Sequence, residues 1–504
     1  MHRSAWLPLG PVDSAVALVD AVASDIRRGR LASGERLPGT RALAQALGVN
    51  RKTVAAAFAE LEAEGWISLR EGSGAFVSGA IPGGFVPAGG ATVAHNAPAS
   101  PGKIRAPVAG PRTISRVHFS LPPIVETGKE VSWPTARMLG RAKPSPEMIV
   151  MAGGQPDLRV LPLDSLARAW RRALSGTGRS LVDYSDTHGE PTLLSALSDW
   201  LAETRGVRPD ENGLVVTRGS QGALYLIARS ILRAGDRVAV ERFGYGPAWA
   251  VFRQAGMNLV PVEVDSGGLN IDGLSAESNV RAVYLTPHHQ YPTGVVLAPG
   301  RRDQLLKLAA ERNILVIEDD YDHEFHYVGR PVLPLAASDT RGVVIYVGTL
   351  SKALAPGLRV GFVAASPEIV TRLAAYRRLV DRQGDHVTER AVAELILDGS
   401  LGRHIRRSRR TYFRRRNTLL AGLSSAFRAD LIPNDPPGGM ALWVSAPGID
   451  VDAWAARGRA HGVEFTTARE YAFDGKPEPF IRLGFACLDE SEIVEAVRRM
   501  RAAV

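Results

Sequence analysis

A lysine placed after an apolar run is the first residue that points to chemistry. The segment YVGTLSKALAPGLRVGF, residues 346–362, begins as strand-like apolar sequence, breaks into small polar residues, presents Lys352 and offers Arg359 seven residues later. A lysine amine attacks a carbonyl only when it is deprotonated, and burial beside other cationic groups lowers its pKa enough to supply that form. Lys352 is therefore a candidate for binding an aldehyde.

Other strand-to-loop junctions supply the groups that a pyridoxal phosphate site needs, namely an acid for the pyridinium nitrogen, an aromatic ring and phosphate donors. The buried-looking strand NILVIEDDY carries Asp319, which would pair with the pyridine nitrogen, and Tyr245 in ERFGYGPA would stack on the ring. The expected phosphate donors are Ser220, Gln221, Thr349 and Arg359. Each residue alone has an ordinary structural explanation, so it is the combination that predicts the cofactor.

These residues need a sheet that brings them together. From about residue 147 onward, short apolar runs alternate with amphipathic helical stretches, which is typical of an α/β domain with a largely parallel sheet. Ligands of open α/β sheets collect at the carboxyl ends of the strands. The segment LVVTRGSQGALYLIARSIL predicts a strand, a turn and a helix whose first backbone N–H groups form a phosphate cradle.

The N-terminal segment, residues 12–78, predicts a DNA-binding fold. AVALVDAVASDIRRGRL has helical apolar spacing and ends at Gly29, and a short helix is expected from Thr40. A turn at 48–50 then leads to a longer helix over 51–64, and two short strands follow around Gly72 and Gly74. This order predicts a winged helix-turn-helix.

In such a unit, the polar residues that open the second helix of the motif face the major groove. Acidic and basic residues balance over 12–78, so the arrangement of the charges, rather than their sum, must support DNA binding. A small helical protein-interaction domain is the alternative. The candidate DNA contacts are Arg36, Arg41, Asn50, Arg51, Lys52 and Thr53, with Gly72 and Gly74 in the wing.

Composition limits the remaining possibilities. The chain has 504 residues, 45% apolar and 22% charged, which indicates a globular protein of two or three domains. The net charge of +9 is compatible with a polyanionic partner. Cys487 is the only cysteine, which excludes an intrachain disulfide and a CxxC zinc module and fits a reducing cytoplasm. We expect no metal site, no signal peptide and no membrane span.

Two sets of motifs carry a resemblance to a known family. RLPGTRALAQALGVNRKTVAAAFAELEAEGWI with GSGAFV resembles the GntR-type winged helix-turn-helix, with Asn50 in place of that family's usual serine. GGQPDLRVLP, YSDTHGEPTLLSAL, HHQYPTGVVL, EDDYDHEFHY, GTLSKALAPGLRVGF and IRLGFACL resemble a fold-type I aminotransferase domain in that family's order. The whole chain resembles the MocR subfamily of GntR-type regulators. We therefore expect a DNA-binding domain at 12–78, a Gly/Pro/Ala-rich linker at 79–146 and an aminotransferase-like domain at 147–504.

The resemblance implies roles for individual residues. Lys352 is implied as the Schiff-base lysine, Asp319 as the pyridine partner, Tyr321 as a contact to the ring hydroxyl and Arg359 as a phosphate ligand. Tyr291 stands where catalytic aminotransferases commonly carry an asparagine that tunes the ring oxygen. The other implied ligands are Arg482, for a substrate or effector carboxylate, and Tyr184, which would reach the partner subunit's phosphate in a homodimer.

Two classes of function remain open at this point. One is a transcriptional regulator that binds double-stranded operator DNA and senses pyridoxal phosphate itself or an amine or amino acid. The other is a catalytically active aminotransferase with an appended DNA-binding domain. The N-terminal unit and Tyr291 favour the first class, whereas Lys352 and Asp319 also permit the second. The basic run RHIRRSRRTYFRRR, residues 403–416, is either a second DNA contact or a solvated helix with a few buried arginines.

Overall fold

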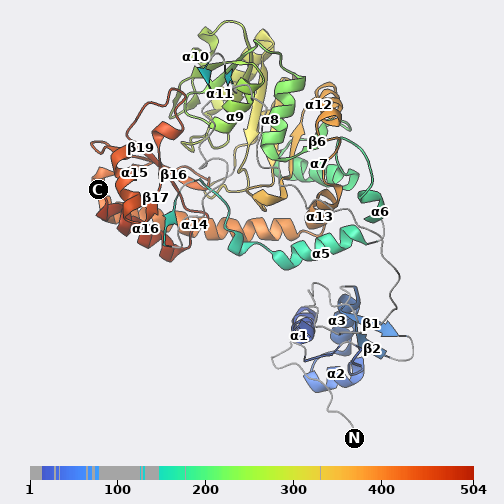
Figure 1. The fold of residues 1–504 in the computed structure, drawn as a ribbon. Helices are drawn as coiled ribbons and strands as arrows, with labels where there is room; N and C mark the ends of the chain where they lie inside the picture. The colour runs from blue at the N-terminus through green and yellow to red at the C-terminus, as the bar shows by residue number, and fades with distance from the viewer. Residues whose placement is uncertain are drawn as a thin grey trace, which may run out of the picture. The chain divides into compact units, whose positions relative to one another are not determined.

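The computed structural model describes residues 14–27, 30–32, 34–63, 66–70, 74–78, 125–126, 129–130, 147–151, 153–175, 178–329 and 331–504. The chain divides into two compact units, Met1–Ser120 and Leu121–Val504, which we describe separately (Figure 1). Most of the linker expected over 79–146 lies outside the described residues. Its described part is a short antiparallel pair, β3 (Val125–Glu126) and β4 (Lys129–Glu130).

The first unit is a winged helix-turn-helix, as predicted. Its elements are α1 (Ala15–Arg27), α2 (Thr40–Leu47), α3 (Arg51–Ala63), β1 (Ile67–Arg70) and β2 (Gly74–Val77), the last two paired antiparallel. Gly48 ends α2 in the left-handed region, with φ of 68°, and the Asn50 side chain accepts a hydrogen bond from the Lys52 N–H at 2.9 Å. This turn fixes where α3 begins. Apolar residues of all three helices and Trp66 form one core.

The second unit is built on a seven-stranded sheet in the order β6-β14-β13-β12-β11-β7-β8. Strand β14 is antiparallel to both its neighbours, and the other six strands run parallel to one another. The strands are β6 (Leu214–Thr217), β7 (Arg237–Glu241), β8 (Asn258–Val262), β11 (Val280–Leu285), β12 (Leu315–Asp320), β13 (Val344–Thr349) and β14 (Gly361–Ala364).

Helices cover both faces of this sheet, which explains why its strands are continuous apolar runs. On β13, Ile345 and Val347 face the core formed with α8 (Gly219–Ser230), α9 (Gly246–Gln254) and α12 (Pro367–Val380). Tyr346 faces the opposite core. The helices on that side are α5 (Leu163–Leu174), α7 (Pro191–Arg205), α10 (Ile271–Ala276), α11 (Pro299–Arg312) and α13 (His386–Leu397).

A smaller α+β part completes the second unit. An antiparallel sheet in the order β15-β16-β19-β18 packs with three helices around the largest apolar core of the chain's described part. These elements are β15 (Ile432–Pro433), β16 (Ala441–Ser445), β18 (Thr466–Thr467), β19 (Phe480–Gly484), α14 (Ser400–Phe427), α15 (Val451–Ala460) and α16 (Glu490–Ala502). Within the described ranges, none of the helices is long and apolar enough to cross a membrane.

Short elements connect these layers. Strand β5 (Ile149–Val150) pairs in parallel with β17 (Val463–Glu464), and β9 (Val264–Asp265) forms a hairpin with β10 (Gly268–Leu269). The remaining helical pieces are α6 (Gly178–Leu181), η1 (Leu158–Val160), η2 (Leu335–Ala337), η3 (Pro356–Leu358), η4 (Arg428–Asp430) and η5 (Ala468–Glu470). The six parallel strands all end at one edge of the large sheet, so the loops that follow them meet there.

Candidate functional site

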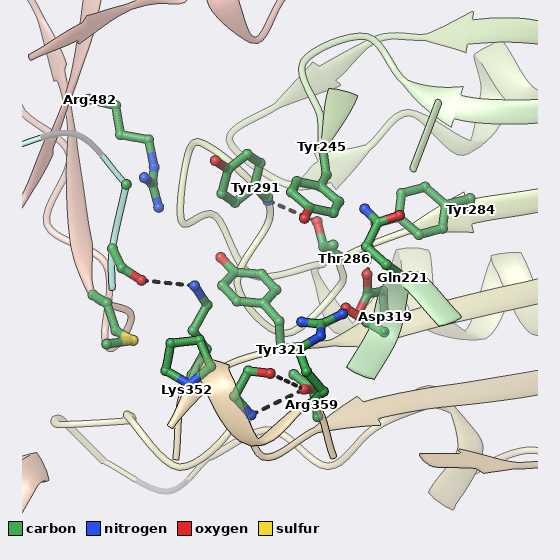
Figure 2. A pocket seen from close by; sticks show the side chains of 17 residues that line it. Gln221, Tyr245, Tyr284, Thr286, Tyr291, Asp319, Tyr321, Lys352, Arg359 and Arg482 are labelled. Carbon is green, nitrogen blue, oxygen red and sulfur yellow. Dashed lines mark hydrogen bonds between the residues drawn. The ribbon is translucent and has the colours of Figure 1, made fainter. Parts of the chain in front are cut away.

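A pocket opens at the carboxyl edge of the large sheet (Figure 2). Loops after β6, β7, β11, β12 and β13 contribute to it, and the C-terminal part adds residues from β19 and from the turn before β16. Its lining residues are Gly153, Gly154, Ser220, Gln221, Tyr245, Tyr284, Thr286, Tyr291, Asp319, Tyr321, Thr349, Ser351, Lys352, Pro356, Arg359, Met440 and Arg482.

The structure brings nearly all the residues expected around the cofactor into this one pocket. They are Ser220, Gln221, Tyr245, Tyr291, Asp319, Tyr321, Thr349, Lys352 and Arg359, together with the expected carboxylate ligand Arg482. Tyr184 is the exception. Its side chain is largely exposed and lies against Arg382, whose guanidinium carbon is 4.1 Å from the ring centroid. Tyr184 therefore does not line the pocket of its own chain.

Lys352 follows the end of β13 and reaches into the pocket. The half-buried Nζ donates a hydrogen bond to the Gly154 carbonyl oxygen at 3.2 Å. Thr349, the last residue of the strand, shapes the turn, because its Oγ1 accepts from the Ser351 N–H at 3.1 Å. The predicted strand, polar turn and lysine are thus observed, and the amine contacts the backbone carbonyl of Gly154.

Asp319 is a buried acid with one of its two carboxylate oxygens lacking a hydrogen-bond partner. Its Oδ2 accepts from the Tyr284 hydroxyl at 2.9 Å, whereas Oδ1 has no partner. Burial raises the pKa of Asp319 to about 7. A buried, unpartnered carboxylate oxygen at the wall of a pocket is costly without a cationic neighbour, and a protonated pyridine nitrogen is such a neighbour. This observation fits pyridoxal phosphate.

The raised pKa of Asp319 predicts that the stability of the cofactor-free protein depends on pH. The folded chain retains this proton to about pH 7, whereas an unfolded aspartate loses it near 3.8, so Asp319 lowers stability as pH rises between these values. We expect cofactor-free Asp319→Asn to match the wild type near pH 4 and to exceed its unfolding free energy by about 2–4 kcal/mol at pH 8. Denaturant melts at both pH values measure this.

Asp199→Asn, at an exposed site on α7, is the matched control and should show no such divergence. An Asp319→Asn variant whose stability follows that of the wild type at every pH would mean that Asp319 ionises in the folded chain as it does in water.

The start of α8 and Arg359 form the anion-binding end of the pocket. Gly219 opens the helix with φ of 68°, a conformation that favours glycine, and a Cβ added there would lie 2.9 Å from the Arg359 Nη2. Arg359 Nη2 donates to the Arg218 carbonyl oxygen at 2.9 Å, and the buried Gln221 Nε2 has no partner. Helix N–H groups, an amide and a guanidinium suit a phosphate.

An aromatic wall with one arginine forms the opposite end. The Tyr291 ring lies edge-on to Tyr245, Tyr321 and Tyr471, with centroids 5.5, 5.9 and 5.6 Å away. The Arg482 guanidinium carbon lies 4.6 Å from the Tyr291 centroid. Arg482 is buried, and its Nε and Nη1 have no hydrogen-bond partner, which fits a carboxylate-binding group.

Support for Tyr291 comes from a residue that the sequence analysis missed. The Tyr291 N–H donates to the Thr286 Oγ1 at 2.8 Å, and Thr286 Oγ1 in turn donates to Glu241 Oε2 at 2.9 Å. Glu241 is buried at the end of β7, and burial raises its pKa to about 8. Thr286 directly follows an apolar strand, which was the available signal. Tyr284, two residues earlier, carried no signal because its sequence context is that of an ordinary core tyrosine.

Of the predicted DNA-contacting residues, Asn50, Arg51, Lys52 and Thr53 lie at the start of α3, and Arg41 lies in the first turn of α2. Arg41, Arg51 and Lys52 are exposed, and Thr53 is half-buried. The Asn50 side-chain oxygen accepts from a backbone N–H, so it caps α3, which the sequence analysis did not anticipate.

The remaining predicted contacts belong to the wing. Arg36 is exposed and lies against Gly74, where an added Cβ would be 3.3 Å from its Nε. Gly72 lies outside the described residues.

The basic run occupies α14, and its arginines divide into two groups. Arg415 and Arg416 are buried and pair with Asp157 and Asp435, the first pair at 2.9 Å. These two arginines are therefore engaged in ion pairs within the domain. The exposed members are Arg403, Arg406, Arg407, Arg409, Arg410 and Arg414. A DNA contact by this exposed face stays a prediction.

Comparison with known proteins adds two family matches. Residues 146–500 match the family described as aminotransferase class I and II, and residues 15–77 match the family described as bacterial regulatory proteins, gntR family. The aminotransferase match thus covers more than half of the chain, and the gntR match covers the winged helix-turn-helix.

Individual proteins show the same combination. The chain is 30% identical to the probable rhizopine catabolism regulatory protein MocR of Rhizobium meliloti, over 96% of this chain and 92% of that protein. It is also 30% identical to the HTH-type transcriptional regulator TauR of Rhodobacter capsulatus, over 96% and 95%. Among solved structures, the Pyrococcus horikoshii kynurenine aminotransferase complex with PMP matches with a TM-score of 0.67 and 30% identity, over 71% of this chain and 91% of that one.

Proposed function

The chain belongs to the class I and II aminotransferase family and is a GntR-type regulator, and we propose that its pyridoxal phosphate pocket is a sensor that controls DNA binding. The observation that supports this proposal is the presence, in one chain, of a winged helix-turn-helix and of a pocket that unites Lys352, Asp319, Arg359 and Arg482.

Each of these residues has a distinct task in the proposed sensor. When bound, the cofactor supplies an aldehyde that amines can attack and a ring that withdraws electrons. Lys352 would supply the amine that holds that aldehyde. Asp319 would hold a proton on the pyridine nitrogen with its free Oδ1, and Arg359 with the start of α8 would bind the phosphate. The aromatic wall around Tyr291 restricts water on the remaining side.

The effector is either the cofactor itself or an amine or amino acid that joins it in the pocket. A free amino acid would present its amine to the cofactor and its carboxylate to Arg482, whose Nε and Nη1 are unpartnered. Buried, unpaired guanidinium nitrogens favour a carboxylate ligand because both the charge and the hydrogen bonds are then satisfied. The environment of Arg482 therefore favours an amino acid over a simple amine as the effector.

The partners follow from the two domains. The proposed operator is double-stranded DNA, and the proposed active form is a homodimer that presents two winged domains to two half-sites. In that dimer, the exposed Tyr184 would contribute to the partner subunit's site. A regulator of this kind works in the cytoplasm, where the chromosomal DNA is.

Operator titrations with three forms of the protein test the sensor proposal. We expect the cofactor-free, cofactor-loaded and amino-acid-treated forms to differ in operator affinity by about 5–150-fold, the usual size of an allosteric coupling of 1–3 kcal/mol. Fluorescence anisotropy at fixed salt measures this. The same titrations with Arg482→Gln should lose the amino-acid effect and keep the effect of the cofactor. Identical operator affinities for all three forms would refute the sensor.

Catalytic aminotransfer is the second candidate, because Lys352, Asp319 and Arg482 also suffice for binding an amino acid next to the cofactor. Steady-state turnover between amino acids and keto acids separates the two candidates. Sustained turnover with no change in operator affinity would favour the enzyme, whereas an affinity change at turnover near background would favour the regulator.

A further inference from the structure

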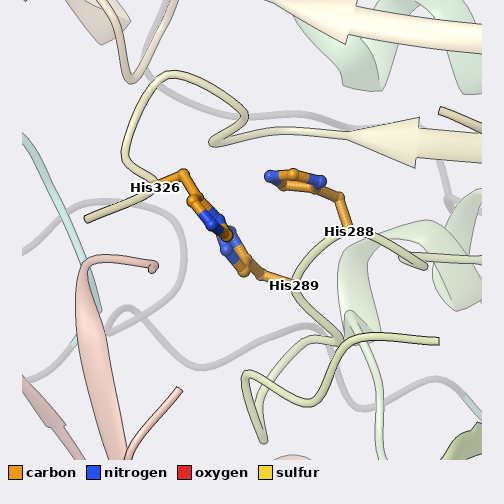
Figure 3. A group of neighbouring side chains, drawn as sticks. All are labelled: His288, His289 and His326. Carbon is orange, nitrogen blue, oxygen red and sulfur yellow. The ribbon is translucent and has the colours of Figure 1, made fainter. Parts of the chain in front are cut away.

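Three histidines gather in the interior beside the cofactor pocket (Figure 3). His288 and His289 follow β11, and His326 follows β12. These two strands pair in parallel, so the loops after them emerge side by side. The exposed fractions of the three side chains are 3%, 1% and 7%. No role in binding the cofactor or the effector accounts for them.

Most of the imidazole nitrogens in this group have no hydrogen-bond partner. These nitrogens are both ring atoms of His288, the Nε2 of His289 and the Nδ1 of His326. One nitrogen from each residue can be chosen so that all three lie within 4.8 Å of one another. Buried polar atoms without partners are costly, and several that converge on one point indicate a missing cation or ligand there.

A neighbouring carboxylate fixes the tautomer of His289. The His289 Nδ1 lies 2.8 Å from the Asp322 Oδ1, and because a carboxylate only accepts, Nδ1 carries the proton. The lone pair of Nε2 is then free to bind a metal, as in the carboxylate–histidine–metal arrangement. Asp322 Oδ2 is buried and unpartnered, so a cation nearby would also balance this charge.

The hydrogen bonding of His289 is compatible with metal binding. Neutral imidazole is the form that binds a metal. A doubly protonated His289 paired with Asp322 would need an acceptor for its second N–H, and Nε2 has none.

We propose that His288, His289 and His326 form a binding site for a divalent transition metal, with Asp322 as the supporting carboxylate of His289. Three imidazoles suit zinc, copper or nickel rather than magnesium or calcium. Zinc lies about 2.0–2.1 Å from each nitrogen, so the nitrogens of a tetrahedral site are about 3.4 Å apart. The rings must therefore close by roughly 1.4 Å at most.

Two neighbours shape this site. His323 stacks on His288 with a centroid distance of 4.4 Å and an angle of 28°, and it lies 2.9 Å from Asp320, which holds it outside the metal-binding group. Gly438 packs on the edge of His289, where an added Cβ would be 2.4 Å from Nε2. A side chain at position 438 would therefore collide with the edge of His289 that is proposed to bind the metal.

The metal site adjoins the pocket without sharing residues with it. The Tyr321 hydroxyl, which lines the pocket, donates to the His289 carbonyl oxygen at 3.0 Å. A metal bound by His289 would therefore hold the loop that carries both His289 and Tyr291. Metal binding by these three histidines does not depend on the proposed sensor function.

Metal titration of the full chain tests the proposal. The protein is prepared without a histidine tag, stripped with a chelator and titrated with Zn²⁺ in competition with a chromophoric chelator. We expect one equivalent to bind the wild type, His288→Phe and His326→Phe to lose at least about 100-fold in affinity, and Asp322→Asn to lose about 10–100-fold. Co²⁺ should give a visible d–d absorption in the wild type that both phenylalanine variants lack.

The matched control is His404→Phe. His404 is also buried and also has an unpartnered Nδ1, but it belongs to no group of metal-binding side chains in the part of the chain that the structure describes. This variant should bind Zn²⁺ as the wild type does. Circular dichroism checks the folding of each variant, and His326→Gln replaces His326→Phe if the latter does not fold. A wild type without a saturable site, or unchanged affinity in the His288 and His326 variants, would overturn the proposal.

Discussion

Substitution of Lys352 by alanine should abolish the covalent attachment of pyridoxal phosphate to the chain. The purified wild type should be yellow, absorbing at about 420 nm, and borohydride should fix the cofactor irreversibly to one lysine. Lys352 is the lysine that lines the pocket, with its Nζ 3.2 Å from the Gly154 carbonyl oxygen. In Lys352→Ala the cofactor would be held only by non-covalent contacts, such as those to Asp319, Arg359 and the start of α8, so it should dissociate on gel filtration.

The loss must be specific to this lysine. Lys307→Ala removes an exposed lysine of α11 that pairs with Glu311 at 3.9 Å, and it should keep the full colour and the full yield of reduced adduct. Mass spectrometry of the borohydride-treated digests identifies the modified peptide. If Lys352→Ala still forms a reducible adduct in wild-type yield, Lys352 is not the attachment site.

Asp319→Ala distinguishes attachment from retention. It leaves Lys352 in place but removes the oxygen that would face the pyridine nitrogen, so the reducible adduct should still form while the cofactor Kd rises. Unchanged cofactor affinity in this variant would mean that another acid holds the ring nitrogen.

The pocket was predictable because its residues stand at the ends of apolar strands. Asp319, Thr349 and Lys352 follow or end buried runs, and in a parallel sheet such positions meet at one edge whatever their separation in sequence. Ser220 and Gln221 were found for the related reason that a glycine-containing turn opens a helix there. Pattern and topology together placed these side chains without any knowledge of their contacts.

Other features depend on contacts that sequence spacing does not reveal. Tyr284 and Glu241 lie inside strands, and only the pairing of neighbouring strands shows that one bonds Asp319 and the other bonds Thr286. Asn50 has a side chain that can read bases, but its position before α3 makes it a helix cap as well. The histidine cluster joins residues 288 and 326, whose spacing matches no common metal motif.

The buried and exposed arginines of α14 likewise could not be told apart from the sequence alone. Arg415 and Arg416 look like the rest of the basic run, yet Arg415 pairs with Asp157, 258 residues away, and Arg416 pairs with Asp435, 19 residues away. Neither acid stands in a recognisable sequence pattern. Burial of an arginine is therefore decided by a partner elsewhere in the chain. Only the exposed members of the run remain available to a polyanion.

The second large effect is expected at the start of α3. Arg51 is exposed at the first turn of this helix, and the Asn50 cap fixes the turn from which it projects. A recognition-helix arginine that contacts a base contributes about 1–3 kcal/mol of discrimination, so Arg51→Ala should weaken operator binding by roughly 5–150-fold. Adding Lys52→Ala should bring the remaining affinity close to that for unrelated DNA.

A matched variant separates the loss of a specific DNA contact from the loss of one positive charge. Arg372→Ala removes one positive charge from the exposed surface of α12, where Arg372 pairs with Glu368 at 2.9 Å, and it should leave operator affinity unchanged. Cofactor absorbance should be the same in all these variants, because the substitutions lie outside the pocket.

The salt dependence of operator binding then shows which kind of contact each side chain makes. Loss of a phosphate contact lowers the slope of log affinity against log salt concentration by about one, whereas loss of a base contact lowers affinity and relaxes base preference at one position. Operator binding by Arg51→Ala, Lys52→Ala with wild-type affinity and specificity would show that α3 does not read the DNA through its first turn.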